Sequence, residues 1–325
     1  MSTLANTLRP FWAPGLNDIS GNIVKGLGGW LTDEEFNIFE PVKAKHFVLS
    51  MADAEPFLAA LAADINRTAI AAYESVRLAT RSTLFPKSTA WPVIKSYYAA
   101  FFAAHAILRM LGTGFTTLEI PHAASINRIA TLYGVSNENV TPGTFTFTYF
   151  GAQREAHWDR FDSSSGGVHE RFWAFFRLRI ANLSRDVLKT GGGITSDNQA
   201  VSGRLTELLD NLCYEACPKG NWLSVVRNRV NCRHQFGAWY PYRPEDSWGA
   251  ADERMTNHWL ADPMGINLTS HAERNLRRFQ ETCSFIVACC RVLVSDMASR
   301  CANGKSFHTY GWLAIDRFAR QRESR

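Results

Sequence analysis

The stretch that decides the fold runs from Trp91 to Leu111, and its centre, residues 97–104, reads Tyr-Tyr-Ala-Ala-Phe-Phe-Ala-Ala. Built as a helix, this sequence is apolar on nearly every side. Such a helix lies in the middle of a bundle, because neighbouring elements have to cover it all round. The sequence therefore predicts a mainly all-α protein with this segment at the centre of a helical bundle.

Further helices are indicated on both sides of this stretch by apolar residues at helical spacing. One begins at Asp53 and continues to about Val76. Two more are expected from Val168 to Lys189 and from about Ser196 to Ala216. A last long helix opens with a capping box, Ser270 to Glu273, and ends near residue 303.

Two regions depart from this helical pattern. Residues 1–52 form an expected N-terminal extension, which ends in a candidate strand from Lys45 to Met51. Residues from about 113 to 166 form an expected small irregular or β insertion, with a short helix from Ser125 to Tyr133 and an alternating strand from Thr144 to Tyr149. The expected domains are therefore the extension 1–52, a helical domain 53–310 that contains the insertion, and a C-terminal helix or tail 311–325.

Composition limits the class of protein. The chain has 325 residues, is 46% hydrophobic and contains 10 Trp and 21 Phe, which is enough to fill a large core. A net charge of +5 permits a polyanionic partner without demanding one. The seven cysteines are odd in number and all follow residue 212, which is not a secreted disulfide framework. With no leader and an apolar run interrupted by Arg291, we expect a cytoplasmic protein without a membrane segment.

The segment that carries the chemical signal is residues 222–243, which read Trp-Leu-Ser-Val-Val-Arg-Asn-Arg-Val-Asn-Cys-Arg-His-Gln-Phe-Gly-Ala-Trp-Tyr-Pro-Tyr-Arg. Its composition predicts a short helix from Trp222 to Phe236. On such a helix Arg227 and His234 share a face, roughly 10 Å apart along the axis, with Asn231 between them. Both long side chains can then converge on one anion.

These residue types suit RNA cleavage. A histidine can take a proton from the 2′-hydroxyl or give one to the 5′ leaving oxygen at neutral pH. A guanidinium matches phosphate oxygens and stabilises the charge that builds on the phosphorane.

The segment resembles the nuclease motif of the HEPN superfamily, in which an arginine, usually followed by a polar residue, precedes a histidine by four to six intervening residues. Arg227, Asn228 and His234 fit this pattern with six intervening residues. Residues 96–106 are similar to the tyrosine-rich and alanine-rich early helix of these proteins. The resemblance implies that the expected mainly all-α fold is a HEPN-like helical bundle.

Carried over to these positions, the resemblance implies that Arg227 binds the phosphate, Asn228 assists it and His234 is the acid or base. Arg229 fits the shorter form of the motif, but its offset of five residues turns it away from His234 on an ideal helix. Arg227 is therefore favoured as the catalytic arginine, and Arg229 stays open. The residues expected to bind RNA are Arg229, Asn231, Arg233, Trp239 and Tyr240.

The function that the resemblance implies is metal-independent endoribonuclease activity by 2′-hydroxyl attack, without a cofactor, in a toxin or an anti-phage defence effector. Family members dimerise so that two motif helices face each other, so we expect a homodimer. An antitoxin or a sensor subunit is a further partner class. Phe236 stands where some family toxins carry a tyrosine that a partner enzyme modifies, so we do not expect silencing by that route.

Two alternatives stay open. The first is a catalytically inactive HEPN-like adaptor, or an RNA-binding or scaffold subunit, in which Arg227 and His234 are only part of a basic helix face. The second is a zinc site formed by Cys213, Cys217, Cys232 and His234, which have suitable ligand atoms. The nuclease interpretation predicts no metal site.

Overall fold

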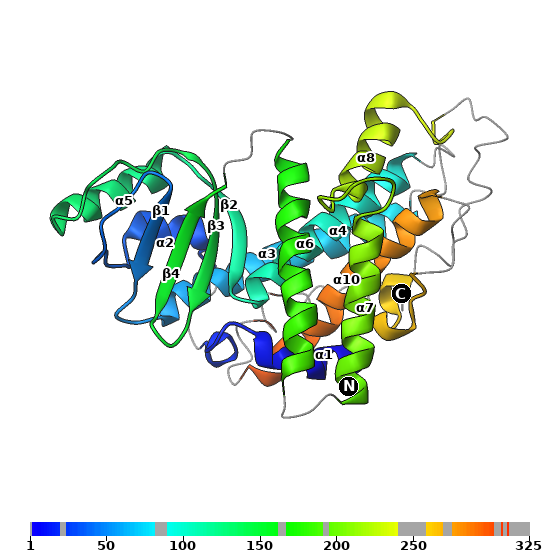
Figure 1. Cartoon of the computed structure of the whole chain (residues 1–325), viewed down its shortest axis with the longest axis horizontal. Helices are drawn as coiled ribbons and strands as arrows, with labels where there is room; N and C mark the ends of the chain where they lie inside the picture. The colour runs from blue at the N-terminus through cyan, green and yellow to red at the C-terminus, as the bar shows by residue number, and fades with distance from the viewer. Residues whose placement is uncertain are drawn as a thin grey trace, which may run out of the picture. The chain divides into compact units, whose positions relative to one another are not determined.

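The computed structural model describes residues 2–19, 24–81, 90–161, 167–190, 195–239, 258–268 and 275–301, together with residues 307 and 311. Figure 1 shows that this part of the chain is mainly helical and contains one small sheet, which confirms the expected class. The helices are α1 (Thr3–Leu8), α2 (Leu27–Asp33), α3 (Glu55–Arg81), α4 (Ala90–Met110), α5 (Ile120–Leu132), α6 (Val168–Lys189), α7 (Ser196–Leu212), α8 (Trp222–Arg233) and α10 (Asn275–Arg300). The strands are β1 (His46–Ser50), β2 (Thr113–Leu118), β3 (Gly143–Phe150) and β4 (Glu155–Arg160).

The chain forms two compact units, each assembled from segments distant in sequence. Unit 1 comprises Met1–Pro10, Ala69–Ala104 and Ser165–Leu293. Unit 2 comprises Phe11–Thr68, His105–Ser164 and Val294–Arg325. Helices α3, α4 and α10 each contribute residues to both units.

Helix α4 is buried, as its sequence predicts. Trp91, at 49% exposure, is its only exposed residue, and Ala99, Ala100, Ala103 and Ala104 have no exposed surface. In unit 1, Phe101 of α4 packs edge-on against Phe172 of α6, with ring centroids 4.6 Å apart. Helices α6 and α7 pack along each other in the same unit (Figure 1). The small alanines let neighbouring helices approach α4 closely, while the aromatic rings fill the space between them.

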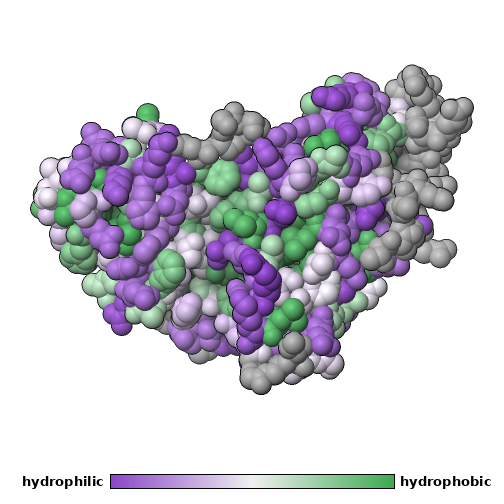
Figure 2. All heavy atoms as spheres, viewed as in Figure 1, coloured by the Kyte–Doolittle hydropathy of each residue, from purple (hydrophilic) through white to green (hydrophobic). Residues whose placement is uncertain are grey.

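Unit 2 is organised around an antiparallel sheet with strand order β1-β4-β3-β2. One face carries the fully buried Phe47, Phe147 and Trp158, and the Trp158 ring packs against both phenylalanines. Phe57 of α3 covers this face, with its ring centroid 6.2 Å from that of Phe147. The alternate positions are mostly polar, with exceptions that include Val48 and Phe150, and Figure 2 shows a largely hydrophilic surface over the sheet. The polar side chains include His46, Ser50, Glu155, His157 and Asp159. Period-two alternation thus separates a core face from a solvent face.

The sheet corrects the expectation that residues 1–52 and the insertion at about 113–166 are separate regions. The N-terminal extension and the insertion, which the sequence pattern treats separately, both contribute strands, because β1 pairs with β4. The strands expected around residues 45–51 and 144–149 are confirmed as β1 and β3. Strands β2 and β4 were not expected, since neither shows a clean alternation of apolar and polar residues.

Several helix ends also differ from expectation. Helix α5 begins at Ile120, earlier than the expected Ser125, because Glu119 and His122 form a reciprocal cap at its start. Helix α7 ends at Leu212, before the expected Ala216. The capping box from Ser270 to Glu273 lies outside the described residues, as does nearly all of the expected C-terminal segment 311–325.

One described helix segment, Leu276–Arg300, is long and apolar enough to cross a membrane by length and composition. Within the most apolar 18-residue stretch of this segment, 78% is buried inside the protein. A mostly buried apolar helix fits the core of a soluble protein.

Candidate active site

Helix α8 carries the predicted motif and is anchored in unit 1 by its apolar residues. Trp222, Leu223, Val226 and Val230 are fully buried on one side of the helix. The Trp222 ring packs edge-on against Tyr214 and against Phe279 of α10, at centroid distances of 5.2 and 6.2 Å. This anchoring fixes the rotation of α8 and therefore the direction of its polar residues.

The end of α8 differs from the expected helix, which continued to Phe236. The last helical residue is Arg233, and His234 adopts the left-handed conformation with φ of 52°. The N–H groups of His234 and Gln235 both donate to the Arg229 carbonyl and close the helix. Arg227 and His234 therefore do not lie on one continuous helical stripe, and the sequence-based geometry is wrong at this point. His234 is exposed, just beyond the helix that carries Arg227.

The chain after His234 folds back on α8. Trp239 Nε1 donates a hydrogen bond of 2.8 Å to the Val230 carbonyl, and its ring packs against Trp91 at 5.6 Å. The His234 ring lies 5.9 Å from the Trp239 ring. Trp239 thus has packing partners of its own, and stacking on RNA bases stays a prediction for it. Tyr240 lies outside the described residues.

Arg227 points into an aromatic cluster rather than along the exposed surface of α8. Its guanidinium carbon lies 5.1 Å from the Tyr97 ring centroid and 6.0 Å from that of Tyr98. The side chain is half-buried, and its Nε is buried without a hydrogen-bond partner. Among the described residues, Arg227 forms no ion pair with a carboxylate.

Tyr97 joins Arg227 to two residues of α6. The hydroxyl of Tyr97 lies 2.9 Å from His169 Nδ1 and accepts a hydrogen bond of 3.0 Å from Trp173 Nε1. Burial raises the pKa of Tyr97, so the hydroxyl keeps its proton at neutral pH. Burial, and then the positive charge of Arg227, lower the pKa of His169 to about 4. We call Tyr97, Tyr98, His169, Trp173 and Arg227 the Arg227 cluster.

The remaining predicted residues of α8 differ in what they contact. Arg229 forms an ion pair of 2.5 Å with Glu215, so its charge is already neutralised. Asn228 is half-buried, and Asn231 and Arg233 are exposed. Figure 2 shows hydrophilic residues gathered over α8.

The four residues of the zinc alternative do not assemble. Cys213 accepts a hydrogen bond of 3.2 Å from Arg177 Nε, Cys232 is exposed, and burial raises the pKa of the Cys217 thiol. The described residues, which include all four candidate ligands, contain no group of three His, Cys, Asp or Glu that could hold a metal ion. The zinc alternative is therefore wrong for this set of residues.

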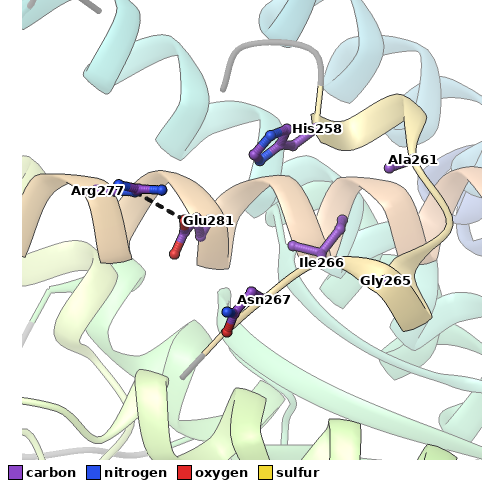
Figure 3. Close-up of a pocket in the computed structure, with 7 residues that line it drawn as sticks. All are labelled: His258, Ala261, Gly265, Ile266, Asn267, Arg277 and Glu281. Carbon is purple, nitrogen blue, oxygen red and sulfur yellow. Dashed lines mark hydrogen bonds and ion pairs between the residues drawn. The ribbon is translucent and has the colours of Figure 1, made fainter. Parts of the chain in front are cut away.

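A pocket of about 410 Å³ lies elsewhere in unit 1 and shares no residue with the Arg227 cluster. Figure 3 shows His258, from a short helix at His258–Leu260, above α10, which carries Arg277 and Glu281. Arg277 Nε lies 3.3 Å from Glu281 Oε1. Because Arg277 is already paired with a carboxylate, the pocket is a weaker candidate for binding an anion than Arg227 is.

Sequence reasoning missed His169 and Tyr97 as partners of Arg227. They lie on α6 and α4, far from α8 in the chain, so no local spacing connects them. The available signal was Tyr97 itself, because a tyrosine in the middle of a buried helix needs a partner for its hydroxyl.

No family model, no curated protein and no solved structure matches the chain. The likeness to the HEPN superfamily therefore stays a prediction.

Proposed function

We propose that this chain is a metal-independent endoribonuclease of HEPN type, in which Arg227 binds the scissile phosphate, Asn228 assists it and His234 transfers a proton. The observation that carries the proposal is the half-buried Arg227 guanidinium without a carboxylate partner among the described residues. The inactive adaptor or RNA-binding scaffold is the alternative that the experiment below distinguishes.

The charge of Arg227 is informative because burying a charge without a counterion is unfavourable. The aromatic rings of Tyr97 and Tyr98 offset part of this cost through cation–π contacts. An anionic ligand would offset the rest, and a phosphodiester fits the planar guanidinium well. Arg229, paired with Glu215, lacks this property, which supports Arg227 as the catalytic arginine.

His234 supplies proton transfer in this proposal. It is exposed at the end of the helix that carries Arg227, where a bound RNA strand can reach it. In the reaction the 2′-oxygen loses its proton to a base and attacks the phosphorus, the P–O5′ bond breaks, and the 5′-oxygen takes up a proton. The products are a 2′,3′-cyclic phosphate and a 5′-hydroxyl. Residues 222–239 contain no aspartate or glutamate, so the segment itself offers no carboxylate to a magnesium ion.

The proposed partners follow from the same chemistry. RNA is the substrate, and the exposed Asn231 and Arg233 are candidate backbone contacts. One exposed histidine supplies only one of the two proton transfers, so a homodimer in which two α8 helices face each other would complete the site. An antitoxin or a sensor subunit would regulate an effector used as a toxin or in defence. Light scattering that gives a monomer at micromolar concentration, with full cleavage activity, would contradict the dimer.

The test is cleavage of end-labelled tRNA and mRNA in EDTA by the parent, Arg227→Met and His234→Asn. Asn is the appropriate replacement for His234, because it tolerates the left-handed backbone at that position. The exposed neighbour Gln235→Ala is the matched control. Loss of cleavage in the first two variants alone supports the proposal, whereas equal cleavage by all four proteins, or none by the parent, supports the adaptor alternative.

A further inference from the structure

The hydrogen bonds of the Arg227 cluster determine which nitrogen of His169 carries a proton. Trp173 Nε1 can only donate, so the Tyr97 oxygen accepts that hydrogen bond. The Tyr97 hydroxyl proton then needs an acceptor, and His169 Nδ1 lies 2.9 Å away. The nearby guanidinium of Arg227 can only donate. Ser224 Oγ lies near enough to lower the pKa of Tyr97, but it is buried without a hydrogen-bond partner of suitable geometry. Nδ1 of His169 is therefore an acceptor without a proton.

A neutral imidazole that accepts at Nδ1 carries its proton on Nε2. The surroundings favour the neutral form, because the ring packs between Tyr97, Tyr98 and Phe101, at centroid distances of 5.6, 6.1 and 4.6 Å. The positive charge of Arg227 also opposes a second positive charge on His169. His169 thus presents a fixed N–H donor at Nε2.

The Nε2 donor is available to a ligand. Among the described residues, His169 makes no hydrogen bond besides the one at Nδ1. The ring is half-buried, and Nε2 is not among the enclosed polar atoms that lack a partner, so it keeps contact with solvent. His169 Nε2–H and the Arg227 guanidinium can only donate, and the two groups are close enough for the charge of Arg227 to affect His169. Among the described residues, no carboxylate pairs with either of them.

We propose that His169 is a second ligand of the scissile phosphate: its neutral Nε2–H donates to a non-bridging phosphate oxygen beside the guanidinium of Arg227. This inference rests on the proposed function for the identity of the anion. It assigns His169 no proton transfer, so His234 keeps that role. Tyr97 and Trp173 act through His169, as positioning residues that hold its tautomer.

The first test is independent of RNA cleavage. Nitrogen-15 NMR of histidine-labelled full-length protein at pH 7, with the His169 resonances identified by their loss in His169→Gln, reports the tautomer directly. The expected result is a neutral ring protonated at Nε2, and Tyr97→Phe should lower the population of that tautomer. A ring protonated at Nδ1, or an imidazolium, would overturn the proposal.

The second test uses a 2′-O-methylated RNA of mixed sequence, which has no free 2′-hydroxyl and so cannot be cut by this route. Its affinity, measured by fluorescence anisotropy, should fall on the order of 10-fold in His169→Ala, as expected for one lost hydrogen bond to a charged group. His169→Gln should retain most of the affinity, because its amide nitrogen can occupy the Nε2 position, and His258→Gln is the control. Equal binding by parent and His169→Ala overturns the inference.

The two proposals fail in different ways. If the parent does not cut RNA yet binds the methylated RNA through His169, the nuclease proposal is wrong and the phosphate ligand stands. If the parent cuts RNA and His169→Ala cuts and binds it equally well, the nuclease proposal stands and the second ligand is wrong.

Discussion

Replacing Arg227 with methionine separates a functional arginine from a structural one. Methionine keeps an unbranched apolar side chain against the Tyr97 and Tyr98 rings and removes the charge. The lost cation–π contacts cost about 0.5–2 kcal/mol. The buried Nε that has no hydrogen-bond partner disappears as well, which returns about 1–3 kcal/mol of desolvation cost. These two contributions offset each other, so the free energy of unfolding should stay within about 1 kcal/mol of the parent.

Cleavage should respond very differently to the same change. Removing one group that stabilises transition-state charge lowers the rate by about 10²–10³, which corresponds to roughly 2.7–4 kcal/mol. The two measurements are urea unfolding followed by tryptophan fluorescence and initial cleavage rates in EDTA, with the exposed Arg185→Met on α6 as control. A loss of several kcal/mol of stability, with cleavage in proportion to the folded fraction, would show that Arg227 is structural and would refute the reasoning.

Three further predictions concern His234, the core of unit 2 and His169. His234→Ala should be roughly 1 kcal/mol less stable than His234→Asn in urea unfolding, since alanine is strained in the left-handed conformation, and cleavage should be lost equally in both; equal stabilities would contradict this. Asp64→Ala should cost about 3–5 kcal/mol, because Arg109, which is 6% exposed with its Nε 3.4 Å from Asp64, would keep a buried charge without that partner; a loss below 1 kcal/mol would contradict it. The parent should lose stability relative to His169→Gln as the pH falls from 6.5 to about 4, because the unfolded state takes up the His169 proton first; parallel pH profiles would contradict this.

The central helix shows what local sequence can predict. The run from Tyr97 to Ala104 is apolar in every direction, so its burial follows without knowledge of its neighbours. The alternation from Thr144 to Tyr149 likewise predicts a strand, because period two has a single structural meaning. The pairing of β1 with β4 could not be predicted, since it joins residues about a hundred positions apart and depends on the assembled core.

In the candidate site too, some features follow from local sequence and others depend on the assembled fold. The spacing to His234 predicts Arg227 as the catalytic arginine, and this stays a prediction. Both Arg227 and Arg229 are half-buried, and among the described residues only Arg229 pairs with a carboxylate. The end of α8 was misjudged because Gly237 suggested a later stop, whereas His234 itself adopts the left-handed conformation. His169 faces the motif from another helix, so only the assembled fold brings it to Tyr97.

The most direct test of the account compares two substrates of identical sequence, one all-ribose and one all-deoxyribose, incubated with the parent protein in EDTA. Attack by the 2′-hydroxyl requires that group, so only the ribose substrate should be cut, and its products should end in a 2′,3′-cyclic phosphate and a 5′-hydroxyl. Cleavage of the deoxy substrate, 5′-phosphate ends, or a cleavage that returns only when a divalent ion is added would contradict the account.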